Sequence, residues 1–263
     1  MSGPAAADLT PSPKEPGPTT TVQAPPRPWG FWATSGWVLL TLGSVLSLGP
    51  AITIWVQSSP LGLSLWVNHN RAFLILLAIG PAVIFVGISV LAARLARWPV
   101  AEYLGLVRPR ERDVVLGAAC IIVYMAATLT LISLLGAEWT DAVARRTIDA
   151  YRDARADGSL PLLWLVTVVL APVGEETLYR GFVFRGWAQS RMGVMGTILL
   201  TSVIFALMHH QYNLVVLLFV LCMGLILGWL RWRSGSTTLT ILLHALANSI
   251  GCFVAAIYVG WSS

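Results

Sequence analysis

Long apolar stretches separated by short polar stretches dominate the chain from about residue 33 onward. Each stretch is close to the roughly 20 residues that a helix needs to cross the hydrocarbon core of a bilayer. The stretches cover residues 33–57, 73–95, 114–136, 160–187, 192–209, 213–231 and 236–259. This pattern predicts an all-α, polytopic membrane helix bundle with about 7 transmembrane helices, or 8 if one helix is broken or lies at the interface.

The first 28 residues differ from the rest of the chain. They are rich in Pro, Ala and Thr and have no apolar periodicity. Such a composition cannot bury enough apolar surface to offset the entropy of folding. We therefore expect a disordered Pro-rich tail at 1–28, followed by a single transmembrane helical domain at 29–263.

The composition supports a membrane protein. Only 11% of the residues are charged and 56% are hydrophobic, whereas a soluble domain usually has about 25% charged residues. The formal net charge of +5 comes from arginines between the apolar stretches. We interpret it as a topology signal and a source of contacts with the lipid bilayer, and we expect no nucleic-acid partner.

The distribution of arginine predicts the orientation. With the N-terminus on the cytoplasmic side, most arginines of the connecting segments lie on that side, as the positive-inside rule requires. These are Arg94, Arg97, Arg108, Arg110, Arg112, Arg185, Arg191, Arg231 and Arg233. Arginine outnumbers lysine sixteen to one, which favours a GC-rich bacterial source. We expect a multi-pass protein of a bacterial inner membrane.

One charged stretch on the opposite side, "WTDAVARRTIDAYRDARADG", has two interpretations. Its acidic residues offset its arginines. It is either an amphipathic helix at the membrane interface or a solvated loop.

Two adjacent acids stand out within the apolar stretches. The chain has twelve Asp and Glu residues, and only Glu175 and Glu176 fall inside a predicted span. An ionised side chain at the centre of such a helix costs about 2.5–3.5 kcal/mol, so this position suggests function. Glu176 can pair with Arg180 on the same helix face, while Glu175 points about 100° away and can take a proton from water. The alternative is a salt bridge with one solvated glutamate at a helix end.

Histidines on two later stretches provide partners for these acids. His209 and His210 end the stretch "SVIFALMHH", and His244 precedes Asn248 by one helical turn in "LTILLHALANS". A carboxylate and a neutral imidazole can together hold a water and take its proton. An imidazole and a carboxamide can donate hydrogen bonds to an oxyanion. These groups suit hydrolysis of an amide bond; they are also ordinary zinc ligands, although the His-Glu-x-x-His motif is absent.

Three short motifs in order resemble those of a known family. They are "EETLYRG", then "FALMH" (Phe205 to His209), then "HALAN" (His244 to Asn248). Their order, spacing and position on late membrane helices resemble the CAAX-protease and bacteriocin-processing (CPBP) family, also called the Abi or type II CAAX prenyl endopeptidase family. The segment "EYLGLVRPRERD" also resembles the family's usual lead-in. The resemblance covers about residues 100–250 and locates the catalytic motifs within 171–250.

The resemblance implies an intramembrane endopeptidase of the glutamate type. By motif match, Glu175 is the general base together with His209, and Glu176 and Arg180 support the site. Glu175 lies in the middle of its stretch, whereas His209 lies at the end of its own. For the two to meet, the helix at 160–187 must be long and tilted, and we expect a water-filled cavity between them.

The third motif implies the remaining roles. By the same match, His244 and Asn248 form the oxyanion hole. The expected cofactor is none; if a zinc ion is present, its ligands are Glu175, His209 and His244. The implied partner is a membrane-associated peptide or protein substrate, and His210 has no role in the motifs.

Two other functions remain as alternatives. A proton-coupled transporter also uses intramembrane Glu and His, but transporters commonly contain internal repeats, and we find none in the sequence. A non-hydrolytic bacteriocin-immunity or scaffold membrane protein is the second alternative. Such a protein would be expected to have lost the motif residues, and here they are intact.

Overall fold

A computed structural model describes residues 27–58, 79–135 and 137–261, and within these ranges the regular structure is entirely helical. The tail predicted at 1–28 falls almost wholly outside the described residues, as does the start of the stretch predicted at 73–95. The first part of the bundle contains α1 (Phe31–Ser58), α4 (Ile79–Leu95), the short α5 (Val100–Leu104), α6 (Glu111–Leu135) and α7 (Ala137–Ala156). The last part contains α11 (Gly193–Leu207), α12 (Leu214–Ser234) and α13 (Thr237–Trp261).

Between these parts lies one continuous helical segment, residues 160–187, which we call the motif helix. It is built from α8 (Leu160–Trp164), η1 (Leu165–Leu170), α9 (Ala171–Glu176), η2 (Thr177–Val183) and α10 (Phe184–Trp187). The two η elements are π-helical stretches, in which the turn is wider than in an α-helix.

The helices confirm the all-α polytopic membrane bundle. Among the described residues, five helices are long and apolar enough to cross a membrane: Phe31–Ile52, Glu111–Leu134, Leu160–Trp187, Leu214–Ser234 and Thr237–Gly260. Ile79–Leu95 and Gly193–Leu207 are shorter apolar helices. Large apolar side chains such as Leu134, Val115 and Leu214 are exposed on the outside of the bundle, which fits a protein whose surroundings are lipid rather than water.

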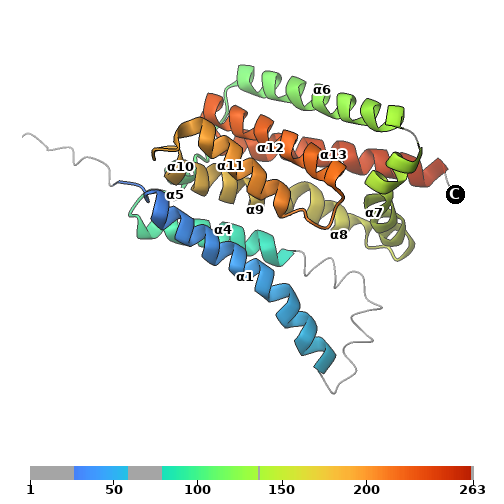
Figure 1. The fold of residues 1–263 in the computed structure, drawn as a ribbon, viewed down its shortest axis with the longest axis horizontal. Coiled ribbons are helices and arrows are strands. Elements are labelled where there is room, and N and C mark those ends of the chain that lie inside the picture. The colour runs from blue at the N-terminus through green and yellow to red at the C-terminus, as the bar shows by residue number, and fades with distance from the viewer. Residues whose placement is uncertain (1–26, 59–78, 136, 262–263) are drawn as a thin grey trace, which may run out of the picture.

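The motif helix is surrounded by the other helices. In Figure 1, α1 and α4 lie on one side of it and α6 lies on the far side of α12 and α13. The motif helix contacts α4, α11 and α13, while α1 packs on α4 and on the end of the motif helix. Side chains on the motif helix can therefore meet groups from early and late parts of the chain.

The charged segment between α6 and the motif helix is helical, so the interpretation as a solvated loop was wrong. It forms α7, which packs against α6, α8 and α13. Ile148 and Tyr151 of α7 are buried against Ala255 and Val259 of α13. Burial of one apolar face explains why this segment folds as an amphipathic helix. Its place at a membrane interface stays a prediction.

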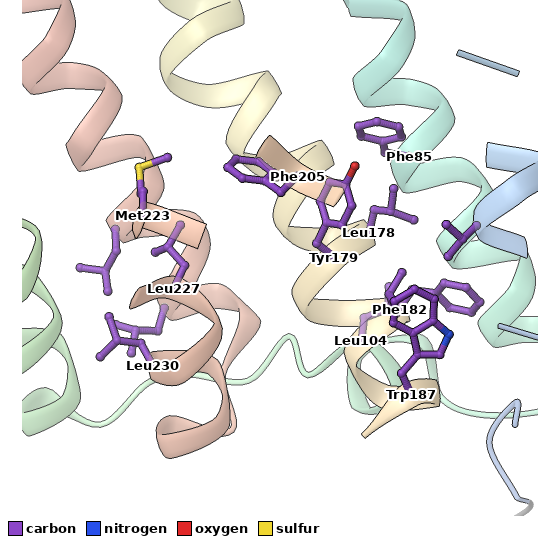
Figure 2. Packing of buried hydrophobic residues seen from close by; sticks show 14 of the residues in the cluster. Phe85, Leu104, Leu178, Tyr179, Phe182, Trp187, Phe205, Met223, Leu227 and Leu230 are labelled. Atoms are coloured by element: carbon purple, nitrogen blue, oxygen red, sulfur yellow. The ribbon is translucent and has the colours of Figure 1, made fainter. Parts of the chain in front are cut away.

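One end of the bundle is densely packed. Tyr103 and Phe182 stack with ring centroids 5.9 Å apart, and buried apolar side chains of η2, α10 and α12 continue this core (Figure 2). The lead-in segment docks here on the start of α13, because Thr237 donates from its backbone N–H to the Gly105 carbonyl at 2.8 Å and from its hydroxyl to the Leu104 carbonyl at 2.6 Å. The end of the motif helix is therefore held by tight packing and by hydrogen bonds between its neighbours.

Candidate active site

The wide turn of η1 leaves one carbonyl of the motif helix to be satisfied from outside. In a π-helical stretch the N–H of a residue bonds to the carbonyl five residues earlier, as Ala171 does with Val166. The next residue is Pro172, which has no N–H to offer Thr167. The side-chain amide of Asn248 donates to the Thr167 carbonyl at 2.8 Å instead. The Thr167 carbonyl thus links Pro172 of the motif helix to Asn248 of the third motif.

The second π-helical stretch is held in a similar way. The Arg231 guanidinium of α12 donates through Nε to the Arg180 carbonyl at 2.9 Å and to the Thr237 hydroxyl at 3.0 Å. Arg231 is itself buried, with its guanidinium over the Phe184 ring. An arginine at the end of a span therefore acts inside the protein and ties η2 to α12 and α13.

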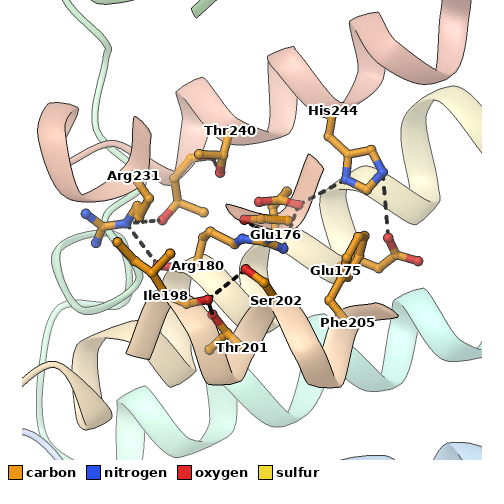
Figure 3. Close-up of polar contacts among 12 residues, drawn as sticks. Glu175, Glu176, Arg180, Ile198, Thr201, Ser202, Phe205, Arg231, Thr240 and His244 are labelled. Atoms are coloured by element: carbon orange, nitrogen blue, oxygen red, sulfur yellow. Dashed lines mark hydrogen bonds and ion pairs between the residues drawn. The ribbon is translucent and has the colours of Figure 1, made fainter. Parts of the chain in front are cut away.

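Glu176 is at the centre of a buried ionic cluster, shown in Figure 3. Its side chain is 0% exposed, and its Oε1 accepts from Arg180 Nη1 at 3.1 Å and lies 3.0 Å from His244 Nδ1. Arg180, 1% exposed, also donates to the Gly224 carbonyl at 2.9 Å and lies over the Phe205 ring. A buried charge is tolerated only when it is paired and hydrogen-bonded. The predicted pairing of Glu176 with Arg180 is present.

Glu175 lies on a different face of the motif helix. Its side chain is 20% exposed, and its Oε2 is 3.8 Å from His244 Nε2, which is too long for a hydrogen bond. Figure 3 shows the His244 ring between the two glutamates, with one nitrogen toward each. The two adjacent acids thus share one imidazole, but only Glu176 is fully enclosed.

His209 is located just beyond a span rather than in it. The helix α11 ends at Leu207, and His209 lies in the turn that follows. Its Nδ1 is 2.8 Å from the Phe205 carbonyl. A carbonyl oxygen only accepts, so Nδ1 carries the proton and Nε2 of the neutral ring is left with its lone pair. The ring is therefore oriented as a base with Nε2 available.

A cavity of about 670 Å³ connects these groups. Glu175, His209, His244 and Asn248 all line it, and its walls come from α4, α6, α7, α12 and α13 as well as the motif helix. A pocket between Glu175 and His209 was predicted from the sequence, and the structure has one that both side chains line. Glu176 and Arg180 lie behind it in the buried cluster.

Two neighbours of this site, Arg231 and Tyr212, are not among the residues predicted from the sequence. Arg231 was assigned to the topology signal, because nothing in a one-dimensional pattern shows that its side chain turns inward. Tyr212 lines the cavity, and its ring stacks parallel to that of His209 with centroids 6.3 Å apart. Its position three residues after His209 was the available signal. His210 is exposed and is not among the residues that line the cavity.

The proposed zinc ligands do not form a metal site as they stand. Within the described ranges, no group of three or more His, Cys, Asp or Glu side chains is arranged to hold a metal ion. His244 directs Nδ1 to Glu176, and its Nε2 faces Glu175.

Comparison with known proteins finds a family that part of the chain matches. Residues 157–250 match the family "Type II CAAX prenyl endopeptidase Rce1-like". The matched segment is about a third of the chain, and over it the chain is similar to that family. This confirms the resemblance to the CPBP endopeptidases, and the matched segment contains all six candidate residues: Glu175, Glu176, Arg180, His209, His244 and Asn248.

A curated relative is similar over part of its length. It is an "Uncharacterized 24.3 kDa protein" of Escherichia coli, 40% identical over 101 residues, which is 36% of this chain. The match spans 46% of that relative, about half its length. No solved structure matches the chain.

Proposed function

We propose that the protein is an intramembrane endopeptidase of the glutamate type. The observation that carries this proposal is the shared cavity, where a carboxylate, two imidazoles and a carboxamide face one space. These four groups come from three separate parts of the chain. The match of residues 157–250 to the Rce1-like family supports the same activity.

In the proposed mechanism, Glu175 and His209 activate the attacking water. Glu175 offers a partly exposed carboxylate to the cavity, and the Nδ1 contact of His209 with the Phe205 carbonyl leaves Nε2 as an acceptor. A water between them can give one proton to the carboxylate while its oxygen attacks the scissile carbonyl carbon. When the C–N bond breaks, Glu175 passes that proton to the leaving amine nitrogen. The products are an amine and a carboxylic acid, which gives its remaining proton to His209 Nε2 or to water.

Asn248 and His244 are proposed to stabilise the oxyanion that forms during the attack. One N–H of the Asn248 amide bonds to the Thr167 carbonyl, and the second can donate into the cavity. His244 directs Nδ1 to Glu176, so it can donate to the oxyanion only when Nε2 also carries a proton.

Glu176 and Arg180 are proposed to act as positioning residues. Both are enclosed and neither lines the cavity. The hydrogen bond from His244 Nδ1 to Glu176 fixes the orientation of the imidazole, and Arg180 fixes Glu176. Loss of either would misplace His244 without removing a group that contacts the substrate.

We further propose a reaction that needs no metal and a substrate that is a membrane-associated peptide or protein. The proposed location is a bacterial inner membrane, with the N-terminus in the cytoplasm. The asymmetry of the arginines supports the orientation. A carboxylate and an imidazole that line one cavity can activate water without a metal, which supports the metal-free reaction.

Cleavage assays with purified protein in detergent test these proposals. Internally quenched peptides are incubated with the wild type, with Glu175→Gln and with His209→Ala, each with and without a chelator. Glu175→Gln keeps the shape of the side chain but removes the base. We expect a loss of about 10²–10⁴-fold in kcat/KM for this variant, and full activity of the wild type in chelator. His210→Ala is the matched control and should retain activity.

The other outcomes identify other functions. Activity that is lost in chelator and restored by Zn²⁺ would make the same side chains metal ligands. Unchanged cleavage by Glu175→Gln would refute the proposed base. An absence of cleavage by the wild type, together with proton-coupled uptake in vesicles, would favour the transporter.

A further inference from the structure

The cavity extends well beyond the groups proposed to carry out the reaction. Along α13 it is lined by His244, Asn248, Gly251, Ala255 and Tyr258, which recur at steps of three or four and so share one helix face. Asn248 and Tyr258 are ten residues apart, which corresponds to roughly 15 Å at 1.5 Å per residue. We call the part of the cavity that α13 lines beyond Asn248 its arm; Gly251, Ala255 and Tyr258 line it.

Gly251 differs from the glycines at which helices of this bundle pack closely. A Cβ at those glycines would meet a neighbour: at Gly117 it would lie 2.4 Å from Leu243, at Gly174 2.7 Å from Ala82, and at Gly224 3.0 Å from Ser202. These three glycines allow close packing between helices. At Gly251 no atom lies within 4 Å of the added Cβ.

Neither packing nor backbone conformation accounts for glycine at this position. Gly251 is in the interior of α13 and is not among the glycines with positive φ. Glycine in a helix interior destabilises by about 0.5–1 kcal/mol relative to alanine. Other glycines with open space around them, such as Gly87, do not line the cavity. What distinguishes Gly251 is that the missing side chain leaves space inside the cavity.

We infer that Gly251 sets the width of a subsite for a large apolar side chain of the peptide substrate, near the scissile bond. The inference rests on the proposed endopeptidase activity and adds a substrate preference to it. The subsite is the arm of the cavity between Asn248 and Tyr258. With glycine at 251 the arm admits a bulky residue; a side chain there would occupy the same space.

The polar groups in the walls favour a peptide as the occupant. Thr147 of α7 and Thr167 of η1 line the cavity along with its apolar side chains. A peptide carries N–H and C=O groups that must find partners away from water, and hydroxyls can supply them. A hydrocarbon chain needs no such partners. The arm, roughly 15 Å long, matches about four residues of extended chain at 3.3–3.6 Å each.

Graded substitutions at position 251 test the inference. Gly251→Ala and Gly251→Leu are compared with the wild type on quenched peptides that differ at one position next to the cleaved bond, which carries Ala, Leu or Trp. We expect Gly251→Leu to lower kcat/KM at least tenfold for the Trp peptide and less than twofold for the Ala peptide. Gly251→Ala should give a smaller change in the same order. Gly87→Leu, a helix glycine outside the cavity, is the control and should change neither.

Two outcomes would overturn the inference. An equal change in kcat/KM for all three peptides would show that the substitution acts on folding or on the catalytic groups. A lowered thermal midpoint would indicate folding, and an unchanged one would indicate the catalytic groups. The second outcome is faster cleavage of a peptide with an S-octyl cysteine, together with a side-chain preference that Gly251→Leu does not change. This result would show that the arm binds a lipid chain instead.

A second measurement does not depend on cleavage. In a background with Cys120, Cys222 and Cys252 replaced by Ala, the thiol introduced by Gly251→Cys is treated with methyl and octyl methanethiosulfonate. We expect both reagents to label it, and Trp-containing peptide to slow the labelling at least tenfold. A further result is that the wild type cleaves none of the peptides while the Trp-containing peptide still protects the thiol. That result would support the subsite and refute the proposed reaction. Absence of labelling would mean that no such space exists.

Discussion

The motif helix has two polar regions that are built in opposite ways. On one face, Glu176 is fully enclosed and bonded to Arg180 and His244. On the other, Glu175 is partly exposed and faces a cavity of about 670 Å³. The two acids are neighbours in sequence and chemically identical, so the difference comes entirely from what packs around each one.

We expect the enclosed acid to contribute mainly to stability and the acid at the cavity to contribute mainly to the reaction. A charge that is enclosed and paired is strongly destabilising to disturb, because its partner is left buried without compensation. A charge at a cavity keeps access to water and to a substrate. We therefore expect the same substitution to affect folding on one face and the reaction on the other.

The largest expected effect on stability is at Glu176. Glu176→Gln would leave Arg180 enclosed without its carboxylate, and removing one partner of a buried pair typically costs about 3–5 kcal/mol. Unfolding in detergent by denaturant or heat measures this change. Glu175→Gln is the matched control, and we expect it to change stability by less than about 1 kcal/mol while it lowers kcat/KM about 10²–10⁴-fold. Similar stability losses in both variants would erase the distinction between the two faces.

A smaller effect is expected at Arg231, which holds η2 from behind. Arg231→Gln removes the donor to the Arg180 carbonyl, and a hydrogen bond from a charged group contributes about 1.5–3 kcal/mol. Arg231→Lys should not restore it, because an ammonium lacks the planar donor geometry. The measurement is thermal unfolding, together with kcat and KM. Arg191→Gln, at an exposed position, should be neutral within about 0.5 kcal/mol.

Substitution of Arg231 also tests whether the enclosed cluster around Glu176 controls the groups that line the cavity. If η2 positions Glu176 and His244, Arg231→Gln will lower kcat more than it raises KM. A change in stability alone, with kcat intact, would mean that the two regions are independent.

The smallest effect is expected at Tyr103, in the dense end of the bundle outside the spans. Its hydroxyl accepts from the Trp29 backbone N–H at 3.3 Å, and burial raises the pKa of Tyr103 to about 12. Tyr103→Phe should cost about 0.5–1.5 kcal/mol at neutral pH.

The pH dependence of that difference has a definite sign. The pKa of tyrosine in an unfolded chain is about 10, and folding favours the neutral form of Tyr103. Its contribution is therefore complete below about pH 10 and is lost as the pH rises toward 12. The stability gap between wild type and Tyr103→Phe should narrow between pH 10 and pH 12. A gap independent of pH would show that Tyr103 titrates normally.

Much of the fold could be predicted from the sequence, because each span must satisfy its own backbone and therefore appears as a long apolar stretch. The pairing of Glu176 with Arg180 followed from their spacing of four. The packing of His244 between two glutamates did not, since it depends on how α13 crosses the motif helix. The link between Asn248 and the Thr167 carbonyl depends on a π-helical turn that no apolar pattern reveals.

The cavity walls were also beyond prediction from the motifs. Pro81 and Phe85 of α4, Leu129 of α6 and Ile148 of α7 all line the cavity, yet nothing in their local sequence distinguishes them from lipid-facing residues. Only the packing of the whole bundle assigns them to the inside.

The source of the walls has a consequence for how such proteins diversify. All six candidate residues lie between positions 157 and 250, whereas one side of the cavity is encoded by the segment from 81 to 148. Mutation or recombination in segment 81–148 can change the shape of the cavity while the six candidate residues stay unchanged. Exchanging residues 79–156 between relatives is thus a direct route to new substrate preferences from one unchanged set of chemical groups.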